Sequence, residues 1–327
     1  MVHAQNIVRR IPNARLVALC DADADALHRA TEELGVERSY MDYREAVSSD
    51  DVDAVLIVTP TFLHREIACE AAVHGKHVFL EKPMAITVEE CHAINAAAGR
   101  AGVKLQVGFM RRFDESFVHA KEVLDSGAMG RVMIVKSTGR GPGLPPPWIF
   151  DIGKSNGIIA EVNSHDLDAV RWLAGSDVAR VYAEAANFKC PEAKEHFPDF
   201  YDNIVVTLRF VNQTMGVVDG TCPSHYGYDA RVEVLCEKGV LFIGNTQQHG
   251  VVQVSVDGQV TARAVKSWRD LFREAYVAEI EDFIRCVLED REPRVTGLDG
   301  LRAVEAVVAA NASLKMQAPV ELQKVPI

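Results

Sequence analysis

The chain has 327 residues, of which 48% are hydrophobic and 25% are charged, and its formal net charge at pH 7 is −11. This length and composition suit a globular protein of two domains, each with a sizeable core. The acidic balance argues against nucleic acid and anionic membranes as partners, because both are bound by clustered lysine and arginine side chains.

The cysteines and the N-terminus indicate a cellular compartment. Seven cysteines are scattered along the chain and none is spaced as CxxC, which is typical of reduced thiols. No run approaches about 18 apolar residues, so we expect no transmembrane helix. The segment from Met1 to Asn6 lacks the basic and apolar regions of a signal peptide. We therefore expect a cytoplasmic protein.

The first third of the chain alternates short apolar runs with helical patterns. The predicted strands are 16–20, 52–58, 77–80 and 104–108. Gly35 is a predicted helix C-cap, and Thr87–Glu90 is a predicted capping box. Strands that are apolar throughout are buried on both faces, so the alternation predicts a Rossmann-like, doubly wound parallel sheet. We assign residues 1–120 to this α/β domain.

Strands follow in close succession from about residue 130. The predicted strands are 132–137, 179–186, 203–210, 216–220, 230–237, 240–243, 251–256 and 260–264. Because short turns join neighbouring strands, we predict a mostly antiparallel open sheet. The predicted helices are 163–173, 270–288 and 300–314. Together these elements predict an α+β domain over residues 121–327.

A Rossmann-like domain normally opens with a strand and G-x-G-x-x-G, and this sequence lacks both. Those glycines let the backbone approach a dinucleotide pyrophosphate, which the following helix N-terminus holds. The sequence begins at Met1 with what we interpret as that following helix. Two explanations stay open: a start assigned too late or a shortened chain, and a genuine protein with an impaired cofactor site.

Asp21 ends the first predicted strand, about 20 residues past the position of the missing loop. An acid at this point accepts hydrogen bonds from the adenosine ribose and repels a 2′-phosphate, so NAD is favoured over NADP. The alternative is that Asp21 only caps the helix that follows.

The ends of the next three strands carry a specific resemblance. They read Thr59-Pro60-Thr61-Phe62-Leu63-His64, Glu81-Lys82-Pro83 and Gly108-Phe109-Met110-Arg111-Arg112. In this order they resemble the glucose-fructose oxidoreductase, inositol dehydrogenase and rhizopine catabolism (Gfo/Idh/MocA) family. Tyr226-Gly227-Tyr228-Asp229 is similar to its inositol dehydrogenase branch. The resemblance implies an NAD-dependent dehydrogenase of a cyclic polyol or sugar.

The resemblance places the chemistry on Lys82 and His165. His165 matches the family's base, and Glu161 stands four residues earlier, where the family usually has Asp. On one helix the two would share a face, so that the carboxylate could orient the imidazole. Lys82 would hydrogen-bond the reacting oxygen and polarise the product carbonyl. His3 resembles the histidine that follows the family's glycine loop.

The resemblance also implies binding residues. For the cofactor they are Asp21, Thr59, Pro60, His64, Glu81, Lys82 and Arg111, and for the substrate Lys82, Met110, Arg111, His165, Tyr226 and Tyr228. Simpler interpretations stay open: Arg111 as a surface charge, each tyrosine as a core aromatic, and Asp166 as a helix cap or a solvent-facing side chain. We expect no metal, because Glu161 and His165 lack a third ligand at metal spacing.

Family members are commonly dimers or tetramers, so we expect a homodimer or homotetramer that uses the outward face of the large sheet. Two other functions stay open. The missing glycine loop is compatible with a non-catalytic scaffold or sensor that binds nucleotide weakly. Glu161 in place of Asp is compatible with an oxidoreductase acting on an acidic or nucleotide-linked sugar.

Overall fold

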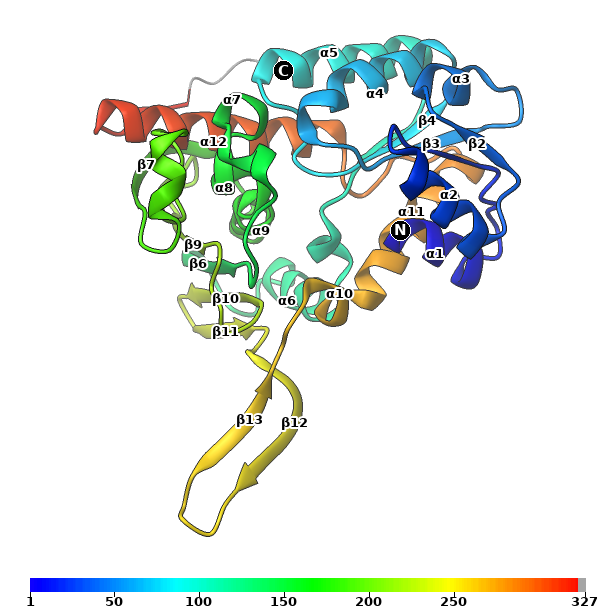
Figure 1. Cartoon of the computed structure of the whole chain (residues 1–327). Helices are drawn as coiled ribbons and strands as arrows, with labels where there is room; N and C mark the ends of the chain where they lie inside the picture. The colour runs from blue at the N-terminus through cyan, green and yellow to red at the C-terminus, as the bar shows by residue number, and fades with distance from the viewer. Residues whose placement is uncertain (323–327) are drawn as a thin grey trace. The chain divides into compact units, whose positions relative to one another are not determined.

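The computed structural model describes residues 1–322, so the end of the predicted second domain, 323–327, lies outside the described residues. The chain divides into two compact units (Figure 1). One comprises residues 1–113 and 274–301, and the other comprises residues 114–273 and the segment from Arg302 onward. No described helix is long and apolar enough to cross a membrane.

The first unit has short parallel strands connected by helices, as the sequence predicted. Its elements are α1 (Val2–Arg10), β1 (Ala18–Cys20), α2 (Ala24–Leu34), β2 (Arg38–Tyr40), α3 (Tyr43–Ser48), β3 (Ala54–Ile57), η1 (Thr61–Leu63), α4 (His64–Val73), β4 (His77–Leu80), α5 (Val88–Ala101), β5 (Leu105–Val107), η2 (Met110–Phe113) and, late in the chain, α11 (Arg273–Leu288). The strand β2 and the helix α3 were not predicted.

The strands of the first unit form two parallel sheets, β1–β2 and β3–β4–β5. We expected one continuous sheet. The structure instead separates β1–β2 from β3–β4–β5.

Two predicted helix ends are confirmed. Gly35 ends α2 in the left-handed region, with φ of 65°. Thr87 and Glu90 form the capping box of α5: the Thr87 side chain accepts from the Glu90 N–H, and the Glu90 side chain accepts from the Thr87 N–H. These local signals fix the end of α2 and the start of α5.

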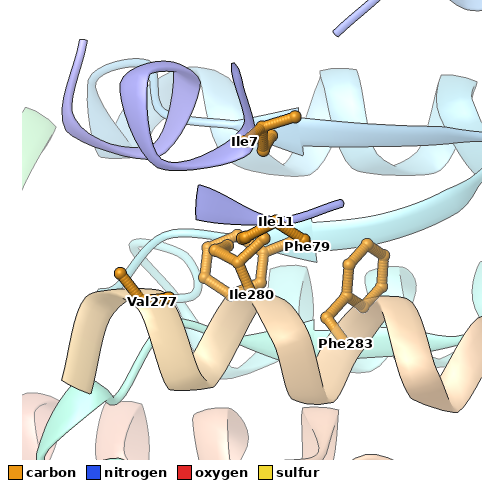
Figure 2. Close-up of a cluster of buried hydrophobic side chains, with 6 residues drawn as sticks. All are labelled: Ile7, Ile11, Phe79, Val277, Ile280 and Phe283. Atoms are coloured by element: carbon orange, nitrogen blue, oxygen red, sulfur yellow. The ribbon is translucent and has the colours of Figure 1, made fainter. Parts of the chain in front are cut away.

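The core of the first unit depends on a segment from the end of the chain. Figure 2 shows the apolar face of α11 against β4 and α1. The buried residues are Ile7, Ile11, Phe79, Val277, Ile280 and Phe283. In addition, Thr296 forms an antiparallel bridge with Gln106 of β5, and Val107 N–H donates to the Val295 carbonyl. Residues 274–301 therefore complete the unit that residues 1–113 begin.

The second unit is built on a mostly antiparallel sheet, as predicted. Its strand order is β11-β10-β6-β9-β8-β7-β14, and only the β6–β9 pair is parallel. The strands are β6 (Val132–Arg140), β7 (Val178–Ala186), β8 (Asn203–Phe210), β9 (Met215–Thr221), β10 (Asp229–Cys236), β11 (Gly239–Ile243) and β14 (Val320–Glu321). In β8 buried residues alternate with more exposed ones, so one face of the sheet is covered and the other is open.

Short helices accompany this sheet. They are α6 (Glu115–Asp125), η3 (Pro147–Phe150), α7 (Ile152–Ser155), α8 (Gly157–Glu161), α9 (Ser164–Ala174), η4 (Pro191–Glu195), α10 (Trp268–Leu271) and α12 (Gly297–Met316), whose first turn belongs to the first unit. Helix α9 packs on β6 and β9.

The strands β12 (Gln247–Val254) and β13 (Val260–Ala264) leave the sheet and form an arm (Figure 1). We expected them within the open sheet. The chain turns away from β11 at Gly244, whose φ of 76° favours glycine. Several exposed valines lie on or beside the arm: Val251, Val252, Val254, Val256 and Val260.

Candidate functional site

The ends of β3, β4 and β5 lie in register. Ile57 pairs with Leu80, and Leu80 pairs with Val107, so the three strands end along one edge of the sheet. The segments that carry Thr59, Lys82 and Met110 begin at this edge. Ligands of open α/β sheets bind outside the carboxyl ends of the strands.

His64 connects two of these segments. Its Nδ1 lies 2.8 Å from the carbonyl oxygen of Pro83, and its Nε2 lies 2.9 Å from the carbonyl oxygen of Thr59. The side chain is buried, and this burial lowers the pKa of His64 although both carbonyl contacts favour the charged form. A neutral imidazole has one N–H and can donate to only one carbonyl at a time. The residue is thus placed to position the backbone.

The Glu81 carboxylate makes two contacts that fix the next residue. Its Oε1 lies 2.7 Å from His3 Nε2, and its Oε2 accepts the Lys82 backbone N–H at 3.1 Å. Burial raises the pKa of Glu81, but the His3 hydrogen bond and the charges of His3 and Lys82 outweigh this and lower it. The Lys82–Pro83 peptide is cis. The half-buried Lys82 extends from a backbone whose N–H the Glu81 carboxylate holds.

The residues of η2 are buried together. Met110 is buried, and Arg111 is 2% exposed, so the interpretation of Arg111 as a surface charge is wrong. The neighbouring Arg112 donates to Asp299 Oδ1 at 3.0 Å. A buried guanidinium at a strand end retains its positive charge, which suits an anionic or hydroxyl-rich ligand.

Asp21 follows the end of β1 and is exposed. Its Oδ1 accepts the Asp23 N–H at 2.9 Å, but the N-cap of α2 is Asp23, which accepts from Asp25 and Ala26. The alternative role for Asp21 as the helix cap is therefore wrong. The exposed carboxylate suits the ribose hydroxyls of a dinucleotide.

In the second unit, Glu161 and His165 lie on different helices. Glu161 is the last residue of α8, and His165 lies in the first turn of α9. The N–H groups of Val162 and Asn163 both donate to the Ile158 carbonyl and end α8. The expectation of one shared helix is wrong, and the two side chains extend from either side of a turn.

A buried polar network holds the first turn of α9. Asp166 Oδ1 accepts from the Ser137 hydroxyl at 2.6 Å, and its Oδ2 accepts from Asn163 Nδ2 at 2.9 Å. Asn163 Nδ2 also donates to the Gly139 carbonyl at 3.0 Å. Asp166 is 0% exposed, so the expectation that it caps the helix or faces solvent is wrong. This network fixes the residues on both sides of His165.

Two paired glycines make room for that network. Gly139 of β6 lies opposite Gly220 of β9. A Cβ on Gly139 would lie 2.6 Å from Asn163 Nδ2 and closer still to the Asp166 carboxylate. A Cβ on Gly220 would overlap the Asn163 side chain. The glycines let α9 approach the sheet closely.

The two tyrosines before β10 differ in environment. Tyr226 is 47% exposed, and its hydroxyl donates to Asp229 Oδ2 at 2.6 Å. Tyr228 is 8% exposed, and its ring packs edge-on against Phe272 with centroids 6.2 Å apart. Tyr228 therefore has the environment of a core aromatic, whereas Tyr226 presents its ring to solvent.

A buried cluster in the first unit was not predicted. His3, Glu81 and Glu279 place one nitrogen or oxygen atom each within 4.8 Å of one another. The three residues lie far apart in sequence, on α1, after β4 and on α11. The available signal was Glu279 itself, an acid among the apolar residues of a helix face.

Both parts of the chain match models of known protein families. Residues 1–109 match the family model for "Oxidoreductase family, NAD-binding Rossmann fold", and residues 117–242 match the model for the "GFO/IDH/MocA C-terminal domain". The chain belongs to the Gfo/Idh/MocA family. It is accordingly an oxidoreductase with an NAD-binding Rossmann-like unit, as the strand-end motifs predicted.

Similarity extends over nearly the whole chain. The chain is 34% identical to the myo-inositol 2-dehydrogenase of Thermotoga maritima, over 99% of this chain and 96% of that protein. It is 33% identical to the scyllo-inositol 2-dehydrogenase (NAD(+)) of Bacillus subtilis, over 98% and 92%.

Solved structures agree. A probable dehydrogenase from Thermotoga maritima is 33% identical, with a TM-score of 0.91 over 98% of this chain and 95% of that one. The scyllo-inositol dehydrogenase of Lactobacillus casei with bound NAD(H) and scyllo-inositol is 27% identical, with a TM-score of 0.89 over 98% and 95%. The fold class predicted from the sequence is confirmed.

Proposed function

We propose that this chain oxidises a secondary alcohol of inositol or a closely related cyclic polyol, with NAD as the hydride acceptor. The observation that carries the proposal is the full-length similarity to proteins named as inositol dehydrogenases. Both units take part in this similarity, so it includes the strand-end segments and the α8–α9 turn.

The proposed chemistry divides between two side chains. Lys82 donates a hydrogen bond to the reacting oxygen and stabilises negative charge that develops there. His165 accepts the hydroxyl proton as a general base, and Glu161 orients its imidazole. When bound, NAD supplies the hydride acceptor. The polar network around Ser137, Asn163 and Asp166 supports this role, because it fixes the helical turn that carries His165.

Binding roles are proposed for the remaining candidates. Asp21 binds the ribose, and Thr59, Pro60, His64, Glu81 and Arg111 form or support the cofactor site at the strand ends. Substrate binding is proposed for Met110, Arg111, Tyr226 and Tyr228, in addition to Lys82 and His165. Tyr228 is buried against Phe272, which supports a role as a wall of the substrate site. A hydrogen bond from a tyrosine hydroxyl to the substrate is therefore assigned to the more exposed Tyr226.

The test is NADH formation from a panel of inositol epimers, aldoses, acidic sugars and nucleotide sugars. We expect turnover of at least one inositol. Turnover confined to an acidic or nucleotide-linked sugar would replace the substrate part of the proposal. No turnover across the panel, with NAD binding intact, would favour a scaffold or sensor protein.

Two variants test the assignment of roles. Lys82→Met and His165→Asn should each lower kcat by roughly 10² to 10⁴ while the fold is retained. Lys238→Met, which removes an exposed lysine from the β10–β11 turn, is the matched control and should leave kcat unchanged. Unchanged turnover in Lys82→Met would remove Lys82 from the mechanism.

Assembly and location are also proposed. The open face of the seven-stranded sheet and the exposed valines of the β12–β13 arm support a homodimer or homotetramer. A cytoplasmic location is supported by the seven cysteines, none of which forms a disulfide.

A further inference from the structure

Helix α11 carries an acidic side chain on its buried apolar face. Glu279 is 0% exposed and lies among the buried Tyr276, Ile280 and Phe283 of the same helix. Within residues 1–322, neither of its carboxyl oxygens has a hydrogen-bond partner. Its backbone carbonyl accepts from Gln106 Nε2 at 2.7 Å, so the helix is fixed against β5 at this point. An ionised carboxylate here would lack both water and a donor.

The neighbours of Glu279 are the groups that constrain Lys82. His3 Nε2 lies 2.7 Å from Glu81 Oε1, and one atom from each of His3, Glu81 and Glu279 lies within 4.8 Å of the others. The His3 ring packs edge-on against Phe79 and Tyr276, with centroids 5.2 and 5.6 Å away. Two carboxyl groups and an imidazole thus occupy one aromatic enclosure.

We propose that His3, Glu81 and Glu279 form one buried acid cluster, in which Glu279 keeps its proton at neutral pH and the ionised Glu81 holds the backbone of Lys82. Two carboxylates this close in an apolar enclosure cannot both be ionised without a large cost. A single proton on Glu279 removes that repulsion and leaves Glu81 free to pair with His3.

The surroundings separate the two acids as the proposal requires. Burial and the charge of Glu81 raise the pKa of Glu279 well above its ordinary value. Hydrogen bonding with His3 and the charge of Lys82 hold that of Glu81 below its ordinary value. The charge of Glu81 also acts on the buried His64, whose ring contacts the Pro83 carbonyl, and it opposes the lowering of the pKa of His64 by burial. Environments that push two neighbouring pKa values apart assign one group as acid and the other as anion.

The same donor set could take a divalent cation, but the contacts favour the proton. Glu81 already uses both oxygens, one with His3 and the other with the Lys82 N–H. The positive charge of Lys82 also acts on Glu81, whose pKa it lowers. A bound cation would have to displace the His3 contact and approach this lysine.

The cluster gives Glu81 and Glu279 positioning roles in the dehydrogenase reaction, which rests on the proposed function of Lys82. Glu81 restrains the peptide from which Lys82 extends. The protonated Glu279 carries no charge that would repel Glu81, so Glu81 stays ionised and paired with His3. Neither side chain needs to touch the substrate for this effect.

Infrared spectroscopy of the full chain tests the protonation directly. We expect a carbonyl stretching band of a buried, protonated carboxyl group at pH 7. Glu279→Gln should remove the band, whereas Glu281→Gln on the same helix should keep it. A parent protein without this band, or a band that survives in Glu279→Gln, would overturn the proposal.

Metal analysis separates the competing explanation. After equilibration with Zn²⁺ or Mn²⁺ and removal of the excess, we expect no stoichiometric metal that depends on Glu279. One equivalent retained by the parent and lost in Glu279→Gln would overturn the protonated cluster in favour of a cation site.

Steady-state kinetics test the positioning role. Glu81→Ala should lower kcat at least about tenfold, and Glu81→Gln, whose amide oxygen can still accept the Lys82 N–H, should recover most of this loss. Equal kcat in Glu81→Ala and the parent would refute the positioning role. If the parent turns over no polyol, the proposed function fails, while the infrared result still decides the state of the cluster.

Discussion

The imidazole Nδ1 of His64 lies 2.8 Å from the carbonyl oxygen of Pro83. The same ring contacts the carbonyl oxygen of Thr59 at 2.9 Å. One buried side chain therefore connects the segments that follow two neighbouring strands, and one of these segments carries Lys82.

Replacing this ring should loosen both segments. We expect His64→Phe to lower the free energy of unfolding by about 1–3 kcal/mol, because it removes the ring N–H that donates to one of these carbonyl groups and leaves that carbonyl without a donor. Urea denaturation measures the loss. His74→Phe, at the exposed end of the same helix, should change the free energy by less than about 0.5 kcal/mol. Equal effects of the two substitutions would contradict the assigned role.

Two partly or fully buried histidines should contribute a loss of stability on mild acidification. Burial lowers the pKa of His64, and burial together with Lys104 lowers that of His77. Just below the ordinary histidine pKa of about 6.5, the unfolded chain binds more protons than the folded one, so the free energy of unfolding rises with pH. The contribution is complete above about pH 6.5 and is lost as the pH falls towards the lowered values. Urea denaturation of the parent and of His64→Phe between about pH 7.5 and 5 should show the His64 contribution as a difference in stability that changes with pH, because the opposite contribution of Glu279 is common to both proteins.

The slope has its own control. His64→Phe should lack the contribution of His64 to the pH dependence, so that only the His77 contribution remains of the two. An unchanged slope in His64→Phe would show that another group titrates.

Gly139→Ala should be strongly destabilising. The new methyl group would overlap Asp166 and Asn163 and would break the network under α9. We expect a loss of about 3 kcal/mol in the free energy of unfolding, measured by chemical denaturation. Gly143→Ala is the matched control, because a Cβ there meets nothing within 4 Å. If the Gly139→Ala protein were as stable as the control, the first turn of α9 would be able to move away from β6, and the predicted overlap would be contradicted.

Glu279→Gln should change how stability depends on pH. Because the pKa of Glu279 is raised on folding, the folded chain keeps a proton that the unfolded chain loses above about pH 4.3. Between about pH 4.3 and the raised pKa of Glu279, this group lowers the free energy of unfolding by about 1.4 kcal/mol per pH unit as the pH rises. Glu279→Gln lacks the term, so its stability relative to the parent should increase from about pH 5 to 8. A constant difference across this range would count against a protonated Glu279.

Charges on the β12–β13 arm should weaken self-association. Val254 and Val260 are cross-strand partners, and both are exposed. If the arm contacts a second copy, Val254→Asp and Val260→Asp should reduce the mass measured by light scattering, since a buried unpaired charge is costly. Val73→Asp, at an exposed valine at the end of α4, should leave the mass unchanged. If all three variants had the mass of the parent, the arm would be excluded from the interface.

Local patterns predicted most of the fold. The apolar run at His77–Leu80 is the strand β4, and the Thr87–Glu90 box begins α5 where expected. Such features depend on neighbouring residues, which a sequence displays directly. The same holds for the strand-end motifs that indicated the family.

Contacts between distant residues could not be predicted in this way. The break between Glu161 and His165 accompanies an Asn163 side chain that bonds to Gly139, 24 residues away. The burial of Asp166 depends on glycines in two strands. The meeting of His3 with Glu279 requires α1 and α11 to pack in one core. In each case the determining partner lies outside the window over which periodicity and capping act.

The dependence of the first unit on residues 274–301 has a consequence for biosynthesis. As the chain leaves the ribosome, residues 1–113 emerge long before Val277, Ile280 and Phe283, which complete their core. Residues 114–273 are synthesised in between, so most of the second unit can begin to fold while Ile7, Ile11 and Phe79 still lack their covering helix. Until α11 arrives, the apolar side chains of this nascent N-terminal segment are open to chaperones and proteases.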